Sequence, residues 1–194
     1  MGIQTLKTGS RTRNVMSGNT LIYPGDFESI ATVTVGSGGA ANVEFTSIPG
    51  TYTHLQLRAI CRTERTIVGD TIYVTINSDT TKANYARHIL YGDGSSATAV
   101  GTTSNSDIGT TPGSSANANV FSANVIDILD YANTNKYKTI RYLAGYDNNG
   151  SGQVRIGSTL WQSTSAITSI KIDNDSGNDI NQYSHFALYG IKGA

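Results

Sequence analysis

Alternating carboxylates near the end of the chain are the first residues that suggest chemistry. Asp173, Asp175 and Asp179 fall within the segment DNDSGND. Oxygen ligands at this spacing suit a hard cation such as Ca²⁺. The segment is not an EF-hand loop, because its sixth position is Asn178 and its twelfth is Ser184. We expect a polar turn between the last two strands, with calcium binding as the alternative.

Two further acidic residues could suit sugar hydrolysis. Asp127 and Asp130 stand beside Tyr131, and glycosidases use two carboxylates that face each other across the scissile bond. Nothing in the sequence places a partner carboxylate opposite either residue. Solvated or turn-capping aspartates are the favoured interpretation, and a small polysaccharide depolymerase is the catalytic alternative.

The remaining reactive side chains are dispersed. His54, His88 and His185 lie far apart, without metal-ligand spacing, and each falls within a strand-like pattern. Cys61 is the single cysteine, which excludes an internal disulfide, and its position beside apolar neighbours predicts a small buried side chain. The sequence contains no nucleophile elbow, Walker loop or zinc-protease motif. We therefore expect a protein that is not an enzyme and that needs no cofactor.

Aromatic side chains offer a binding chemistry in place of catalysis. The candidates for stacking on sugar rings or for subunit contacts are Tyr85, Tyr91, Tyr142 and Tyr146. Tyrosine also fills sandwich cores and interfaces, because it buries area while its hydroxyl finds a partner. A place in the core or in a subunit interface is the favoured interpretation, and a carbohydrate platform is the alternative.

The charge balance limits the choice of partners. Lys and Arg number 14, as do Asp and Glu, and charged residues make up 14% of the chain against about 25% in typical soluble proteins. Because the charges balance, the chain has no net electrostatic field that would attract nucleic acid or an anionic membrane. No apolar run approaches the ~20 residues of a membrane span, and no secretory signal opens the chain. We expect synthesis in a cytoplasm and no nucleic-acid or membrane partner.

Period-2 alternation, rich in Thr, Val, Ile and Tyr, predicts an all-β fold. The expected strands are 30–35, 41–48, 53–62, 71–77, 85–91, 119–129, 137–146, 153–161, 167–173 and 184–192. These roughly ten antiparallel strands predict a β-sandwich of jelly-roll type.

Turn residues between these strands suggest how they connect. The segment 36–39 (GSGG) predicts a hairpin between the first two strands, and 147–150 (DNNG) predicts another. Residues 92–117 are almost entirely small and polar, so we expect a long loop of functional or mobile character. The final strand ends almost at the C-terminus, and such a strand is ordered only when a sheet receives it.

The chain divides into an N-terminal arm, 1–28, and a body, 29–194. The arm shows no sustained period, and its charges before Asp26 are all positive. A segment of this kind cannot bury enough apolar surface to order itself. It is either a frayed terminus or an arm that wraps a neighbouring subunit. The residues expected to contact a partner in the second case are Lys7, Arg11, Arg13 and Tyr23.

Three segments resemble a group of tailed-phage virion proteins, found especially in cyanobacterial and aquatic phages. The segments are FTSIPGTYTHLQLR (45–58), IDILDYANTNKYK (126–138) and FALYGIKG (186–193). The resemblance extends over residues 29–194. It implies a β-sandwich module mounted on a virion as a surface, fibre or decoration protein, and it carries no catalytic residues.

The resemblance leads to two hypotheses about function. Fibre members of the group usually carry a coiled-coil or triple-stranded shaft, and this chain has neither heptads nor a repeat. The leading hypothesis is therefore a capsid decoration or cement protein on the virion surface that bridges subunits of the major capsid protein or another virion protein. Analogy with the three-fold positions of shells suggests a homotrimer. The alternative is a tail or fibre protein that recognises a host surface glycan.

Overall fold

Fourteen strands and one short 3-10 helix make up the described part of the chain. The structure is a computed structural model, and it describes residues 15–17, 20–22, 27–174 and 176–193. The elements are β1 (Val15–Ser17), β2 (Thr20–Ile22), β3 (Phe27–Thr34), β4 (Val43–Phe45), β5 (His54–Cys61), β6 (Gly69–Ile76), η1 (Lys82–Asn84), β7 (Tyr85–Gly92), β8 (Ala97–Thr103), β9 (Asp107–Pro112), β10 (Ser122–Ile128), β11 (Lys138–Asp147), β12 (Gly152–Trp161), β13 (Ile170–Asp173) and β14 (His185–Ile191). The all-β prediction is confirmed.

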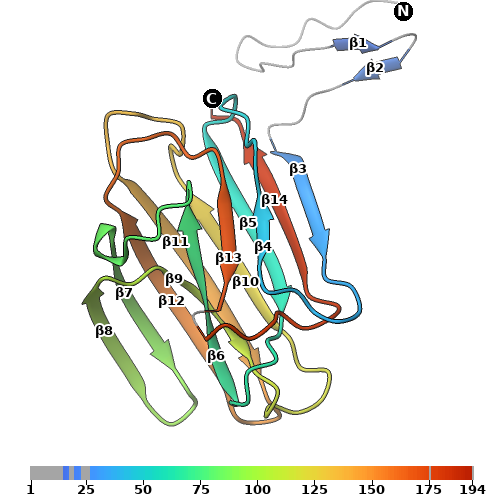
Figure 1. Cartoon of the computed structure of the whole chain (residues 1–194), viewed down its shortest axis with the longest axis vertical. Coiled ribbons are helices and arrows are strands. Elements are labelled where there is room, and N and C mark those ends of the chain that lie inside the picture. The colour runs from blue at the N-terminus through green and yellow to red at the C-terminus, as the bar shows by residue number, and fades with distance from the viewer. Residues whose placement is uncertain (1–14, 18–19, 23–26, 175, 194) are drawn as a thin grey trace, which may run out of the picture.

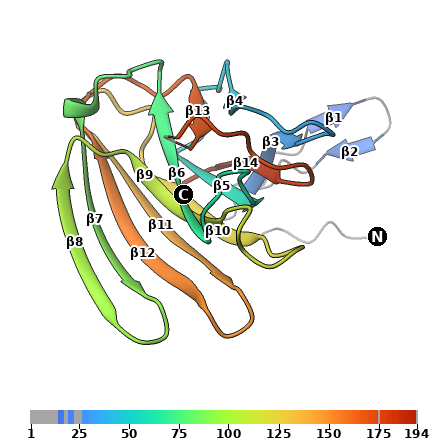
Figure 2. The ribbon, with the colours of Figure 1, turned by 60° about the horizontal axis from the view of Figure 1, so that its bottom comes forward.

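Two antiparallel sheets form the layers of a sandwich (Figures 1 and 2). The large sheet has eight strands in the order β3-β14-β5-β10-β11-β12-β7-β8, and the small sheet has four in the order β4-β13-β6-β9. Strand β9 lies against β10, β11 and β12, so the small sheet covers the middle of the large one. The jelly-roll connection stays a prediction.

Alternation of side chains explains why one face of each sheet is buried. In β6, Ile72, Val74 and Ile76 point into the sandwich with at most 1% of their surface exposed, as the sequence pattern predicts. In β5 the buried positions end at Cys61, which confirms its place in the core. Each such apolar side chain contributes about 1.5–3 kcal/mol by leaving water.

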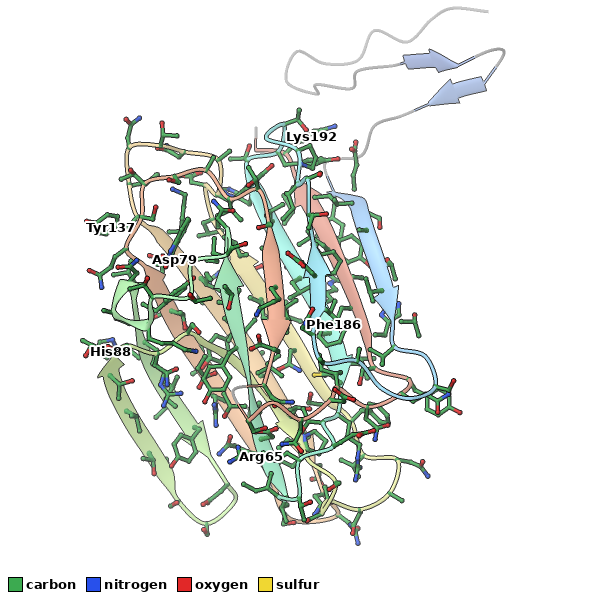
Figure 3. The ribbon with its side chains drawn as sticks, in the orientation of Figure 1. Arg65, Asp79, His88, Tyr137, Phe186 and Lys192 are labelled. Atoms are coloured by element: carbon green, nitrogen blue, oxygen red, sulfur yellow. The ribbon has the colours of Figure 1, made fainter. Side chains whose placement is uncertain are left out.

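The C-terminal strand is an interior strand of the large sheet. Strand β14 pairs with β3 on one side and β5 on the other. Phe186, shown within the sandwich in Figure 3, and Leu188 are completely buried. At the far end, Lys192 Nζ donates to Glu28 Oε1 at 2.7 Å and so ties β14 to β3. The prediction that a sheet receives the last strand is confirmed.

The first predicted hairpin is wrong. Strand β3 lies in the large sheet, whereas β4 lies in the small one, so 36–39 leads from one layer to the other. Val43 and Phe45 face the core from the second layer, and the chain is held on the way by a bridge between Ala40 and Ile180. The DNNG hairpin is confirmed, because β11 and β12 pair from Asp147 opposite Gly152 onward.

The predicted long loop over 92–117 is also wrong, because it contains β8 and β9. Strand β8 pairs with β7 along its whole length. Strand β9 pairs with β6 and is buried at every position. Its polar groups are satisfied inside the fold; for example, Thr111 Oγ1 donates to the Cys61 carbonyl at 2.8 Å. The small and polar residues of β9 therefore gave no sign in the sequence that this segment is a buried strand.

Buried cations hold two of the connecting loops. The Arg62 guanidinium, 8% exposed, donates to four carbonyl oxygens, those of Asn117, Ala116, Val120 and Ser114, at 2.7–3.3 Å. Its charge-assisted bonds close the loop after β9. Lys138 Nζ likewise donates to three loop carbonyls.

The N-terminal boundary differs slightly from the prediction. Strand β3 begins at Phe27, so the body starts two residues before the predicted boundary. Strands β1 and β2 pair antiparallel with each other, and Figure 1 draws them outside the two layers. No helix among the described residues has the length and apolar character of a membrane span.

Candidate interaction surface

Apolar side chains cover the outer face of the large sheet, which the small sheet leaves bare. Ile60, Leu90, Leu143, Val154 and Ile156 are each 51–58% exposed. Together with Val125 they define the outer patch, which spans β5, β10, β11, β12 and β7. Globular monomers rarely expose a contiguous apolar patch of more than a few hundred Å², and larger ones mark interaction sites.

Strand register places the patch residues in direct cross-strand contact. Val125 lies opposite Leu143, Leu143 opposite Ile156, and Ile156 opposite Leu90. The row continues to Ala99 on β8. Cross-strand neighbours have Cβ atoms about 4.5–5.5 Å apart, so the row is an unbroken apolar ridge across five strands.

A second row beside the first is nearly as apolar. It contains Ile60, Ala123, Gly145, Val154 and Gly92 in cross-strand order. Six neighbouring strands, β5-β10-β11-β12-β7-β8, make up this part of the large sheet. With about 4.8 Å between strands and 3.4 Å per residue, their outer face over seven residues has an area of roughly 700 Å². Standard protein interfaces bury about 800 Å² on each partner. The outer face is therefore large enough for one stable contact.

A charged row borders the patch on its other side. Asp127 lies opposite Gln56 on one strand and Arg141 on the other. Gln56 Nε2 donates to Asp127 Oδ1 at 2.8 Å, and Arg141 Nη2 lies 3.6 Å from Asp127 Oδ2. The Arg141 side chain remains 65% exposed. Arg58, also exposed, extends over the stacked rings of Phe27 and Tyr189. The rim therefore adds positive charge beside an apolar centre.

A shallow depression lies where the patch meets this polar row. It has a volume of about 500 Å³ and is lined by Leu90, Ile156, His88 and Arg141, among others. Gly101 makes room for the imidazole, because a Cβ at that position would lie 2.6 Å from His88 Nε2. Figure 3 shows His88 at the β7 side of the molecule. The depression can receive an apolar side chain of a partner. That partner would carry a hydrogen-bond acceptor at the edge of the depression.

The opposite face of the same strands carries a buried charge cluster. Asp107 of β9 is fully buried, and Arg87 of β7 and Arg155 of β12 both donate to its Oδ2, Arg155 at 2.7 Å. Tyr142 donates to Oδ1 at 3.1 Å, and its ring lies over Gly157, where a Cβ would approach to 2.4 Å. The cluster fastens β9 to the large sheet.

Burial governs the titration of this cluster. It raises the pKa of the Asp107 carboxyl, and the positive charges of Arg155 and Arg87 act against that shift. Burial, together with the negative charge of Asp107, raises the pKa of the Tyr142 hydroxyl well above its usual range. The groups hold one another in place between the layers, which is a structural role.

Two of the four predicted tyrosines are not available to a ligand. Tyr85 and Tyr142 are 1% and 2% exposed, which agrees with the favoured interpretation of a place in the core and leaves neither ring open to stack on a sugar. Both face the core because their strand positions have the same phase as the buried residues around them. Tyr91 and Tyr146 are partly exposed, and the Arg155 guanidinium lies over the Tyr91 ring at 5.7 Å. The structure does not bring the four together as a platform.

The paired aspartates have ordinary partners. Besides the contacts of Asp127, Asp130 pairs with Lys136, and its backbone N–H donates to His54 Nδ1 at 3.0 Å. The hydrogen bond from Lys136 lowers the pKa of Asp130. A glycosidase acid needs a raised pKa, so this environment does not favour that role.

The calcium candidates are only partly described. Asp175 lies outside the described residues, and Lys171 Nζ lies 3.1 Å from Asp173 Oδ2. Asn174 organises the turn, since its Oδ1 accepts from the backbone N–H groups of Ser176 and Asn178, both at 3.2 Å. Within the described part of the chain, no three acidic, histidine or cysteine side chains gather as a metal site.

The predicted arm contacts cannot be placed, because Lys7, Arg11, Arg13 and Tyr23 lie outside the described residues. The three histidines do lie on strands, on β5, β7 and β14, as expected. Sequence reasoning missed the outer patch. Its signal was the presence of adjacent apolar pairs, such as Val125-Ile126 and Ile89-Leu90, which is typical of strands covered on both faces.

Comparison with known proteins adds no relative: no family model, no curated protein and no solved structure matches this chain.

Proposed function

We propose that this protein is a structural component of a tailed-phage virion, a capsid decoration protein that bridges neighbouring subunits of the shell. The outer patch is the observation that carries the proposal. A broad apolar sheet face that the second layer leaves bare is typical of a protein that functions while bound to another. The resemblance of three segments to virion proteins supplies the setting.

The rim charges indicate what the patch binds. Arg58 and Arg141 stand exposed beside the apolar rows, with Asp127 already paired between its neighbours. The matching partner is a subunit surface with an apolar centre flanked by carboxylates. Apolar burial supplies most of the affinity in such a contact, and the charges set its orientation.

The mechanism is passive stabilisation by binding. A ligand that binds only the assembled state stabilises that state by mass action. A decoration protein bound across subunit boundaries therefore opposes opening of the shell. The alternative, a glycan-binding tail or fibre protein, lost support when Tyr85 and Tyr142 were found in the core.

Particles of the encoding phage that lack this protein are expected to open at a lower temperature than complete particles. Heating both preparations and following release of DNA by dye fluorescence measures the difference. Adding back the purified protein restores the original temperature if the loss is caused by its absence. Equal opening temperatures for complete and depleted particles would refute the cement role.

A further inference from the structure

The edges of the two sheets differ in how they are protected. Strands β3 and β8 form the edges of the large sheet, and β4 and β9 form those of the small sheet. An edge strand exposes backbone groups that can pair with another chain, and proteins normally block it by charge, proline, a bulge or short length.

Three of the four edges carry such protection. Strand β3 has an extra residue opposite the Leu188–Tyr189 step and carries Glu28. Strand β4 has only three residues, with Glu44 in the middle. Strand β9 is buried, contains a bulge and ends at Pro112. None of these edges is an open template.

Strand β8 has none of these features. Its register with β7 is continuous from Ala97 to Thr103. Residues 95–106 contain no charge and no proline. Every side chain in the strand is Ala, Gly, Thr or Val, and Figure 2 shows the β7–β8 hairpin at the free margin of the large sheet. This edge is open along seven residues.

Two backbone hydrogen bonds define which groups of β8 face outward. Asp93 N–H donates to the Ser96 carbonyl, and Ser104 N–H donates to the Tyr85 carbonyl at 2.7 Å. Backbone pairs alternate along an antiparallel ladder, so even-numbered residues of β8 bond to β7. The N–H and C=O groups of Ala97, Ala99, Gly101 and Thr103 therefore point away from it.

We propose that β8 pairs antiparallel with β8 of a second copy, across a two-fold axis at Val100. This register sets Ala99 opposite Gly101 of the second copy and Ala97 opposite Thr103, so the outward groups of each chain meet those of the other. Each contact is isologous, which is the commonest form of self-association.

The chemistry of the edge favours a second copy over an unrelated peptide. Self-pairing brings no like charges together, because 95–106 has none. The facing side chains are small or β-branched, so no bulky pair collides at the axis. Ala99, at the end of the apolar row, lies beside Gly101 of the second copy, which pairs with His88 in its own sheet.

The pairing would also combine the two outer patches. A two-fold axis between antiparallel neighbours is perpendicular to the sheet, so both outer faces remain on the same side. The dimer then presents both apolar patches on one side of a single sheet, displaced from each other by two residues along the strands. The inference does not depend on the virion setting, and it predicts an even number of copies where analogy suggested a trimer.

An Ala99→Pro substitution tests the pairing without disturbing the monomer. Proline removes an N–H that points away from β7, and edge strands tolerate proline at positions of this kind. Ala99→Ser is the matched control, because it keeps the N–H and adds only a hydroxyl. Light scattering after size exclusion measures the mass of each purified protein, and circular dichroism verifies that each is folded.

The expected result is twice the mass of one chain for the natural protein and for Ala99→Ser, and the mass of one chain for Ala99→Pro. Amide exchange by NMR adds a residue-level readout, in which Ala99 and Gly101 become protected as protein concentration rises. A monomeric natural protein, a dimeric Ala99→Pro variant or a monomeric Ala99→Ser variant would each overturn the pairing. All three outcomes leave the thermal test of the virion role unaffected.

Discussion

An Asp107→Asn variant is expected to lose about 3–5 kcal/mol of unfolding free energy, the range measured when one partner of a buried ion pair is removed. Asn retains the shape of the side chain but not its charge. Arg87 and Arg155 then remain between the layers without the carboxylate to which both donate. Guanidinium groups cannot lose their protons to escape this cost.

Urea unfolding followed by Trp161 fluorescence measures this change, because the Trp161 side chain is buried in the folded protein and its indole N–H donates to Asp79. Asp127→Asn is the matched control: it makes the same chemical change on the outer face, beside Arg141 at 3.6 Å. A surface pair of this kind contributes about 0–1 kcal/mol. Equal losses for the two variants would show that the Asp107 cluster does not hold the layers together.

A Leu143→Lys, Ile156→Lys double variant is expected to lose binding to particles that lack the protein. The two side chains are cross-strand neighbours at the middle of the outer patch. Central apolar positions of interfaces cost about 2 kcal/mol or more when they are hot spots, so binding should weaken by at least about 30-fold. The fold should persist, because both side chains point to solvent.

Co-sedimentation of labelled protein with depleted particles measures the affinity, and thermal unfolding of each variant verifies the fold. Ile67→Lys is the matched control, because Ile67 is an exposed isoleucine in the segment before β6 and is not part of the outer patch. It should bind like the natural protein. Binding by the double variant at natural strength would exclude the outer patch as the contact.

The sequence was sufficient for strands whose two faces differ strongly. The alternation of Ile72, Val74 and Ile76 identified β6 and its buried side, and the apolar ending identified β14. The DNNG turn identified the β11–β12 pair. In each case the local pattern and the final environment agree, which is the condition under which sequence patterns are reliable.

The missed features depend on contacts between distant residues. Strand β9 has a polar sequence, and its Asp107 and Thr111 side chains depend on partners far along the chain, such as Arg155 and the Cys61 carbonyl. Tyr142 appears as a surface candidate until the register of β11 turns it inward. The outer patch required strand order, since its residues come from five strands that are not consecutive in the chain.

Reconstruction of the intact virion by cryo-electron microscopy is the most direct test of the proposed role. We predict density for this sandwich on the head, with the outer face of the large sheet against neighbouring subunits and Leu143 and Ile156 in the contact. Density on the tail, or a sandwich whose outer face points to solvent, would contradict it.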